Sequence, residues 1–165
     1  MATITLKGNT IHTSGELPAI GSKAPDFVLV DKDLKDLRLG DFAGKKKLVS
    51  IVPSLDTGVC ATSTKVFADL LARRSDVVVL TVSCDLPFAQ KRFCSAEGIE
   101  GITTLSMMRS RDFARDYGVL ITDGPLSGLA ARAVVVLDEN DVVRYTEQVP
   151  EITQEPDYDR AIAAL

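Results

Sequence analysis

A proline, a threonine and a cysteine stand at fixed distances in the segment Pro53-Ser54-Leu55-Asp56-Thr57-Gly58-Val59-Cys60. The apolar run 47–52 before it predicts a buried strand, and apolar residues at helical spacing over 61–72 predict a helix after it. If Thr57 caps that helix, Cys60 is its third residue, where unpaired backbone N–H groups and the helix dipole favour an anion. A thiol in this position should ionise readily, and the thiolate is the reactive form of cysteine. The segment therefore predicts a nucleophile, although a free cysteine can also be a small buried hydrophobe.

The remaining cysteines and the single histidine carry weaker signals. Cys84 follows an apolar run and is interpreted as structural, although a second redox role or a pairing with Cys94 stays open. His12 lies in a predicted N-terminal hairpin, so it is a poor candidate for the histidine that a Cys-His hydrolase places beside its nucleophile. Three scattered cysteines and one remote histidine lack the ligand spacing of a metal site, so no metal is expected.

The composition indicates an ordinary globular chain. The 165 residues include 45% hydrophobic and 25% charged residues and carry a net charge of −4, which predicts a single domain over residues 1–165. A basic patch with interleaved aromatic residues is missing, which argues against nucleic acid as a partner. The lysine run 45–47 is interpreted as a solvated turn. The sequence has no membrane-spanning run and no secretion signal at residues 1–6, so we expect a cytoplasmic protein with no membrane partner.

The pattern of apolar runs and turn residues predicts an α/β protein. Strands are expected at 3–6, 10–13, 27–30, 47–52, 77–82, 133–137 and 142–145. Helices are expected at 61–72, 87–98, 110–117 and 156–165, with Asp85 and Ser110 as possible caps and a single helical turn at 41–44. The expected architecture is an N-terminal β-hairpin and a central sheet flanked by helices. We place the site at the carboxyl end of the 47–52 strand, where open α/β sheets usually bind ligands.

Several blocks resemble one known family. The spacing Pro53-x-x-x-Thr57-x-x-Cys60 resembles the peroxidatic motif of the peroxiredoxins. Four further blocks resemble the bacterial thiol peroxidases, which are atypical two-cysteine peroxiredoxins: Asp85-Leu86-Pro87-Phe88-Ala89-Gln90, Arg92-Phe93-Cys94, Gly128-Leu129-Ala130-Ala131-Arg132-Ala133-Val134 and Glu151-Ile152-Thr153-Gln154-Glu155-Pro156. The resemblance implies a thioredoxin-like fold in its peroxiredoxin variant, with a mixed sheet. It also implies an antioxidant peroxidase of hydrogen peroxide and alkyl hydroperoxides that is recycled by thioredoxin, forms a homodimer and needs no bound cofactor.

The resemblance also implies a role for each site residue. Cys60 would be the peroxidatic cysteine, and Cys94 the resolving cysteine that forms an intramolecular disulfide with it. Thr57 would bind the thiolate and the peroxide, Pro53 would shield the pocket, and Arg132 would stabilise the thiolate and the developing negative charge. Without the resemblance, these residues have plainer interpretations. Cys94 could be a buried helix residue, Thr57 a bare cap, Pro53 a strand terminator and Arg132 a surface charge.

A disulfide requires its two Cα atoms to lie about 5.5 Å apart. Because Cys60 and Cys94 fall on separate predicted helices, we expect both helices to unwind partly in each cycle, with soft points at Gly58 and at 95–98. Two other functions stay open at this point. One is a redox switch in which the same disulfide changes a partner surface, and the other is a thioredoxin-fold binding module with inert cysteines.

Overall fold

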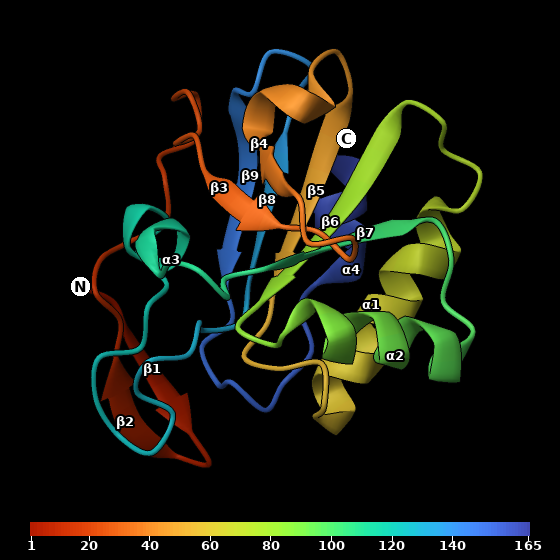
Figure 1. Cartoon of the computed structure of the whole chain (residues 1–165). Coiled ribbons are helices and arrows are strands. Elements are labelled where there is room, and N and C mark those ends of the chain that lie inside the picture. Colours follow the sequence, from red (N-terminus) through yellow and green to blue (C-terminus); the bar gives the residue numbers. More distant parts are fainter.

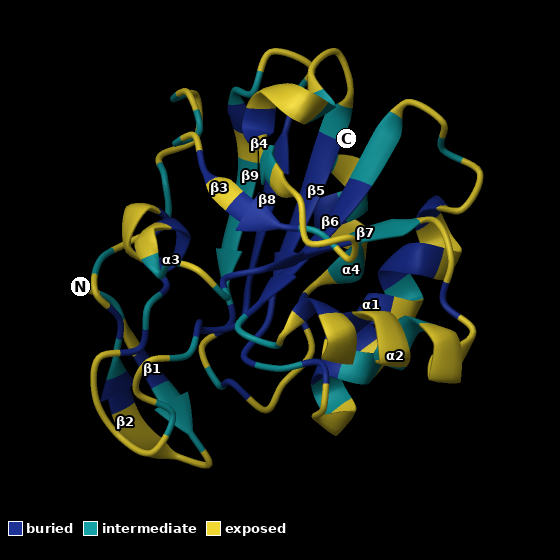
Figure 2. Cartoon of the chain, viewed as in Figure 1, coloured by how far each residue is buried: buried dark blue, intermediate teal, exposed yellow.

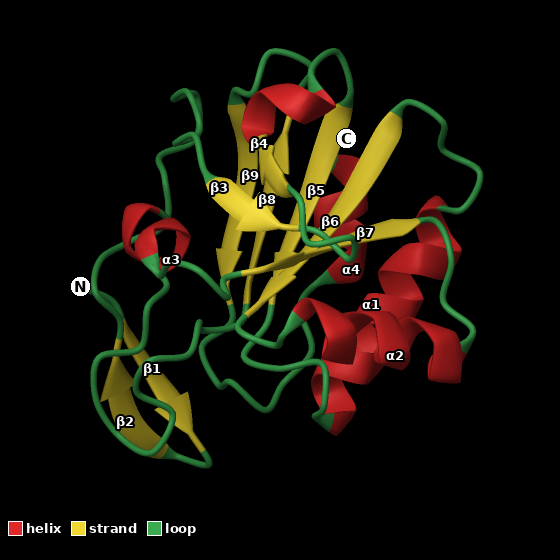
Figure 3. Ribbon diagram, viewed as in Figure 1, coloured by secondary structure: helices red, strands yellow, loops and turns green.

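A seven-stranded mixed sheet forms the centre of the computed structural model, which describes residues 1–165 (Figures 1 and 3). The strand order is β4-β3-β7-β6-β5-β8-β9, in which β5, β6 and β7 are parallel and the outer pairs are antiparallel. The strands are β3 (Val28–Val30), β4 (Asp36–Arg38), β5 (Lys46–Ile51), β6 (Val77–Ser83), β7 (Ile102–Ser106), β8 (Ala133–Leu137) and β9 (Val143–Gln148). The expected central mixed sheet is confirmed.

Four α-helices and one 3₁₀ turn surround the sheet. They are η1 (Leu39–Phe42), α1 (Gly58–Leu71), α2 (Pro87–Glu97), α3 (Asp112–Asp116) and α4 (Tyr158–Ala163). In Figure 1, α1 and α2 lie on one side of the sheet and α3 lies on the other. The expected helices are all present, but α3 and α4 are shorter than predicted. None of the helices combines the length and the apolar character that a membrane crossing requires.

The predicted N-terminal hairpin forms a separate two-stranded sheet of β1 (Thr3–Leu6) and β2 (Asn9–His12). Its turn residues, Lys7 and Gly8, both have positive φ, at 50° and 81°. Two positive φ values in succession give a tight turn whose twist suits the flanking strands, and glycine takes this conformation without strain. The hairpin lies beside the end of the main sheet at which β5 stops (Figure 1).

The central strands of the sheet are largely buried (Figure 2), and apolar clusters lie on both of its faces. Along β8, Val134 and Val136 belong to a cluster with residues of α1 and α4, whereas Ala133, Val135 and Leu137 belong to the larger cluster on the opposite face. This alternation is the period of two that a strand imposes on its side chains. Strands buried on both faces explain why 47–52, 77–82 and 133–137 read as continuous apolar runs.

One local prediction was wrong, and one strand was missed. The lysine run 45–47 is not wholly solvated, because Lys47 is 0% exposed and pairs with the carboxylate of Asp141 in the turn between β8 and β9. The strand β7 was not predicted, because Thr103 and Thr104 make its sequence half polar. It forms by pairing with β6 along its whole length.

Three predicted helix starts also differ in detail. The N-cap of α2 is Leu86 rather than Asp85, although Pro87 and Gly98 begin and end this helix as predicted. Ser110 accepts a hydrogen bond from the N–H of Asp112, but the N-cap position of α3 is Arg111. The last helix begins two residues after Pro156, at Tyr158, because Asp157 provides its N-cap and accepts from the N–H of Arg160.

Candidate active site

Cys60 occupies the third position of α1, with Thr57 as the N-cap, as predicted. The thiol is 0% exposed and packs with Val52 and Leu55, and with the partly buried Phe93 of α2. The first turn of a helix carries backbone N–H groups that have no partner inside the helix, together with the positive end of the helix dipole. The local structure therefore places a sulfur in apolar surroundings beside groups that favour its anion.

Thr57 does not cap the helix with its side chain. Its Oγ1 donates instead to the carbonyl oxygen of Ser54, at 3.1 Å, and the residue is exposed. A hydroxyl has one hydrogen and two lone pairs, so this bond leaves the lone pairs of Thr57 available as acceptors. Pro53 is buried where β5 leads into the loop, next to Val52 of the Cys60 cluster.

Arg132 reaches the same end of the sheet from the neighbouring strand. The last paired residues of β5 and β8 are Ile51 and Ala133, so Arg132 stands one residue beyond this pair, beside the point at which β5 leads into the Cys60 loop. The alternation along β8 places its side chain on the face that Val134 shares with α1. Arg132 is 3% exposed, which excludes the interpretation of a surface charge.

The guanidinium of Arg132 is only partly paired. Its Nε donates to the carbonyl oxygen of Ile152 at 3.0 Å, whereas its Nη1 is buried and has no hydrogen-bond partner. A buried donor without a partner is costly and uncommon in proteins. The structure therefore holds a cationic donor that is free to bind an anion at this end of the sheet.

Asp85 is a site residue that the sequence did not identify. Its carboxylate accepts hydrogen bonds from Ser54 Oγ, Leu55 N and Ser83 Oγ, each at 2.7 Å. It thereby ties the loop before Cys60 to the end of β6, instead of capping α2 as predicted. The available signal was its place two residues after a buried strand that runs parallel to β5, because parallel neighbours end at the same edge of a sheet.

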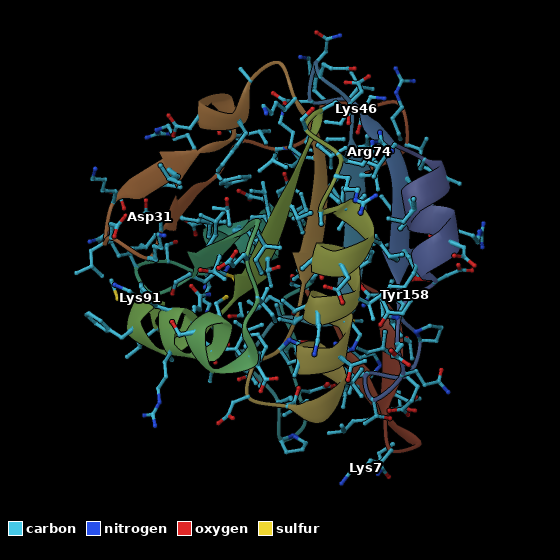
Figure 4. All side chains as sticks on the ribbon, turned by 90° about the vertical axis from the view of Figure 1, so that its right-hand side faces the viewer. Lys7, Asp31, Lys46, Arg74, Lys91 and Tyr158 are labelled. Carbon is cyan, nitrogen blue, oxygen red and sulfur yellow. The ribbon has the colours of Figure 1, made fainter.

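Cys94 lies on a different side of α2 from Phe93, the residue of this helix that packs against Cys60. Cys94 and Lys91 line a cavity of about 640 Å³ between α2 and the loop after β3, whose lining also includes Asp31. Figure 4 shows Asp31 and Lys91 on the same side of the molecule. Phe93 lines a second cavity, of about 560 Å³, which faces the loop before Cys60. All three cysteines are free thiols, and the structure does not bring Cys94 into a disulfide with Cys60.

Burial raises the pKa of the Cys94 thiol, and the positive charge of Lys32 opposes this rise only in part. Cys94 is therefore protonated at neutral pH in this conformation, and a protonated thiol is a weak nucleophile. Reactivity of this thiol thus requires a change in its surroundings.

Cys84 and His12 have contacts of their own. Burial raises the pKa of Cys84, whose Sγ donates to the carbonyl oxygen of Gly128 at 3.7 Å and packs at the edge of the larger core cluster. His12 Nδ1 lies 2.6 Å from a carboxylate oxygen of Asp123. Both contacts agree with the structural interpretations of these residues. The chain contains no group of three or more His, Cys, Asp or Glu residues that could hold a metal ion.

Known proteins resemble this chain over its whole length. Residues 19–162 match the Redoxin family. The chain is 56% identical over 165 residues, 100% of this chain and 99% of the relative, to a thiol peroxidase of Mycobacterium tuberculosis (strain CDC 1551 / Oshkosh). The crystal structure of a peroxiredoxin-like protein from Aquifex aeolicus superposes with a TM-score of 0.92 at 43% identity, covering 100% of this chain and 98% of that one.

A thiol peroxidase from Chromobacterium violaceum superposes with a TM-score of 0.91 at 28% identity, covering 98% of this chain and 93% of that one. These similarities confirm the predicted thioredoxin-like fold in its peroxiredoxin variant. The chain therefore belongs to the Redoxin family and, within it, to the thiol peroxidases of the peroxiredoxin type.

Proposed function

We propose that this thiol peroxidase reduces hydrogen peroxide and alkyl hydroperoxides with Cys60 as the peroxidatic residue. The observation that carries this assignment is the buried, unpartnered Nη1 of Arg132 at the end of the sheet from which the Cys60 segment starts. A guanidinium held there favours the thiolate over the thiol and stabilises the oxygen that leaves with a negative charge. Thr57 retains the lone pairs that can accept a hydrogen bond from the hydroperoxide, and the buried Pro53 covers the end of β5 next to the Cys60 cluster.

In the first step, the Cys60 thiolate attacks the terminal oxygen of the hydroperoxide. A sulfur–oxygen bond forms and the oxygen–oxygen bond breaks, which converts the thiolate to a sulfenic acid. The two electrons of the broken bond leave with the other oxygen. This alkoxide or hydroxide takes up one proton and departs as an alcohol or as water. Arg132 contributes most when this charge develops, because a preorganised donor needs no reorganisation at that moment.

In the second step, Cys94 loses its proton and its thiolate attacks the sulfenic sulfur, which forms the Cys60–Cys94 disulfide and expels hydroxide. The hydroxide takes up a proton and leaves as water. Because Phe93 rather than Cys94 faces the Cys60 cluster, this step requires α2 to unwind and Phe93 to leave its contacts. The hydroxyls of Ser63 and Thr64 both donate to the carbonyl oxygen of Cys60, at 3.1 and 2.7 Å. Such bonds compete with the helical ladder and weaken a turn, which favours opening at the start of α1.

The cycle closes when an external dithiol reductant, thioredoxin, reduces the disulfide. This scheme uses only sulfur chemistry, so it requires no bound cofactor or metal. Family resemblance supports thioredoxin as the reductant, a homodimer as the assembly and the cytoplasm as the location, and these three assignments remain part of the proposal.

The thiol count after one equivalent of peroxide tests this assignment. The parent protein should lose two thiols without gaining a disulfide between chains, as measured by intact mass and non-reducing electrophoresis. Cys94→Ser should stop at a sulfenic acid on Cys60, which adds one oxygen to the mass, and Cys60→Ser should barely react. Retention of peroxide reactivity by Cys60→Ser would show that another sulfur is the nucleophile.

A further inference from the structure

The segment Glu151–Pro156 resembles the family in sequence, but the proposed cycle gives it no role. Its first residue, Glu151, accepts hydrogen bonds from the first strand and from the turn of the N-terminal hairpin. Oε1 accepts from the N–H of Lys7 at 3.0 Å, and Oε2 accepts from the N–H of Gly8 at 3.1 Å and from Thr5 Oγ1 at 2.7 Å. The Thr5 bond, with the Gly8 and Lys7 bonds, lowers the pKa of Glu151 to about 2. The carboxylate is therefore ionised at every physiological pH.

The hydrogen bonds from the hairpin to the Glu151 carboxylate form a clamp. The next residue, Ile152, connects this clamp to the active site. Its N–H donates to the carbonyl oxygen of Thr5 at 2.9 Å, and its side chain is buried in the same core cluster as Ile4. Its own carbonyl oxygen accepts from Arg132 Nε at 3.0 Å. Ile152 thus holds the hairpin through one backbone group and the catalytic guanidinium through the other.

We propose that Glu151 is a positioning residue for the peroxidase reaction. By clamping the hairpin turn, Glu151 fixes the place of the Ile152 carbonyl, and this carbonyl sets the direction in which Arg132 presents its free Nη1. The physical reason is that the donors of a guanidinium lie in one rigid plane, so an acceptor that fixes Nε also restricts where Nη1 points. The inference rests on the role of Arg132 in the proposed function.

The hairpin carries a second clamp that makes a matched control. Asp123 accepts from the backbone N–H of His12 at 2.7 Å, and its other oxygen lies 2.6 Å from His12 Nδ1. This clamp also joins a carboxylate to the hairpin, but it has no hydrogen bond to Ile152 or Arg132.

The Glu151 clamp and Arg132 lie in the same part of the molecule. Figure 4 shows Lys7, whose backbone N–H donates to Glu151, at the hairpin tip below Tyr158. Burial raises the pKa of Tyr158, and Arg132 in turn lies close enough to this side chain for its positive charge to oppose the rise in part.

The test measures the second-order rate of Cys60 oxidation by hydrogen peroxide as a function of pH. A Cys94→Ser background isolates this step from disulfide formation. We expect Glu151→Ala to slow the reaction about tenfold and to raise the pH midpoint of thiolate formation, because misdirecting a positioned group costs this order of magnitude. Asp123→Ala should stay within about twofold of the parent rate. In an Arg132→Lys background, Glu151→Ala should cause almost no further loss, because both changes act through one group.

Three results would overturn the inference. An equal loss in Asp123→Ala would show that any loosening of the hairpin suffices. If the rate of the double variant fell by the product of the two single losses, Glu151 would act independently of Arg132. A normal rate of Cys60 oxidation in Glu151→Ala, together with a slow rate in Arg132→Lys, would refute the positioning role of Glu151 and leave the proposed role of Arg132 intact. A normal rate in Arg132→Lys would instead refute the proposed role of Arg132, and the two failures are thus distinguishable.

Should Glu151→Ala fail to fold, Glu151→Gln takes its place, because the amide keeps one carbonyl acceptor. Its rate should fall about threefold with the same shift to higher pH, and an unchanged rate would contradict the inference.

Discussion

Two buried cations at opposite ends of the central sheet have contrasting surroundings. Lys47, near the start of β5, is 0% exposed and pairs with the Asp141 carboxylate. Arg132, beside the other end of β5, is 3% exposed, has no carboxylate partner and leaves Nη1 without a hydrogen bond. In Figure 4, Lys46, the neighbour of Lys47, lies at the opposite end of the molecule from Lys7 of the hairpin. The hairpin adjoins the end of the sheet at which Arg132 lies.

In the proposed cycle, this difference separates a structural charge, Lys47, from a functional one, Arg132. A buried charge that is paired with a carboxylate is already neutralised, and removing its partner is expensive. A buried cation with a free donor lowers the stability of the resting protein but gains an interaction when an anion forms beside it. The thiolate and the leaving oxygen of the proposed reaction are such anions. The comparison therefore predicts opposite consequences for mutations at the two ends.

The largest expected effect concerns catalysis at the Arg132 end. Arg132→Met should slow the oxidation of Cys60 by peroxide by about 10²-fold, because it removes a preorganised donor for the developing charge. Its thermal unfolding temperature should stay equal to that of the parent or rise, since an apolar side chain replaces an incompletely paired buried charge. Stopped-flow kinetics and calorimetry measure the two quantities. A large loss of stability with little loss of rate would assign Arg132 to the structural class.

The next effect concerns stability at the Lys47 end. Asp141→Asn should lower the free energy of unfolding by about 3 kcal/mol, because it leaves the Lys47 ammonium buried without its counterion. Asn tolerates the left-handed backbone of this position, where φ is 63°, so the change removes charge without adding strain. Denaturant unfolding measures the loss, and the rate of Cys60 oxidation per folded molecule should not change. A slower rate in the folded fraction would couple the two ends.

The smallest expected effect is the titration of the clamp that holds the Arg132 end. The folded pKa of Glu151 is about 2, below the ordinary value of 4.5, so its stabilising contribution is complete above pH 4.5 and is lost as the pH falls toward 2. The amide chemical shifts of Lys7 and Gly8 should report a titration with a midpoint near 2. Glu151→Gln should abolish this titration, and a midpoint near 4.5 in the parent would mean that the clamp is absent in solution.

The sequence predicted those parts of the molecule that depend on local patterns. The continuous apolar runs predicted β5, β6 and β8, and the order of cap, glycine and cysteine correctly placed Cys60 in the first turn of α1. These features depend on neighbours within a few residues, so a periodicity or a cap position is enough to identify them.

Features that depend on distant partners were missed. The partner of Lys47 lies 94 positions away, and Asp85 binds Ser54 across 31 positions. A lysine in a charged run and an aspartate before a helix each have an obvious local interpretation, and in both cases a tertiary contact overrides it. The strand β7 was missed for a related reason, because pairing with β6 rather than its own composition makes it a strand.

In the proposed cycle, the separation of Cys94 from the side of α2 that packs against Cys60 also limits how much oxidant the protein can withstand. Until the helices rearrange, the singly oxidised sulfur waits without its partner, and a second peroxide molecule arriving in that interval converts it to a sulfinic acid that thiols do not reduce. In that cycle, the rate of local unfolding, rather than the chemistry of sulfur, thus sets the peroxide concentration above which the protein is inactivated instead of recycled.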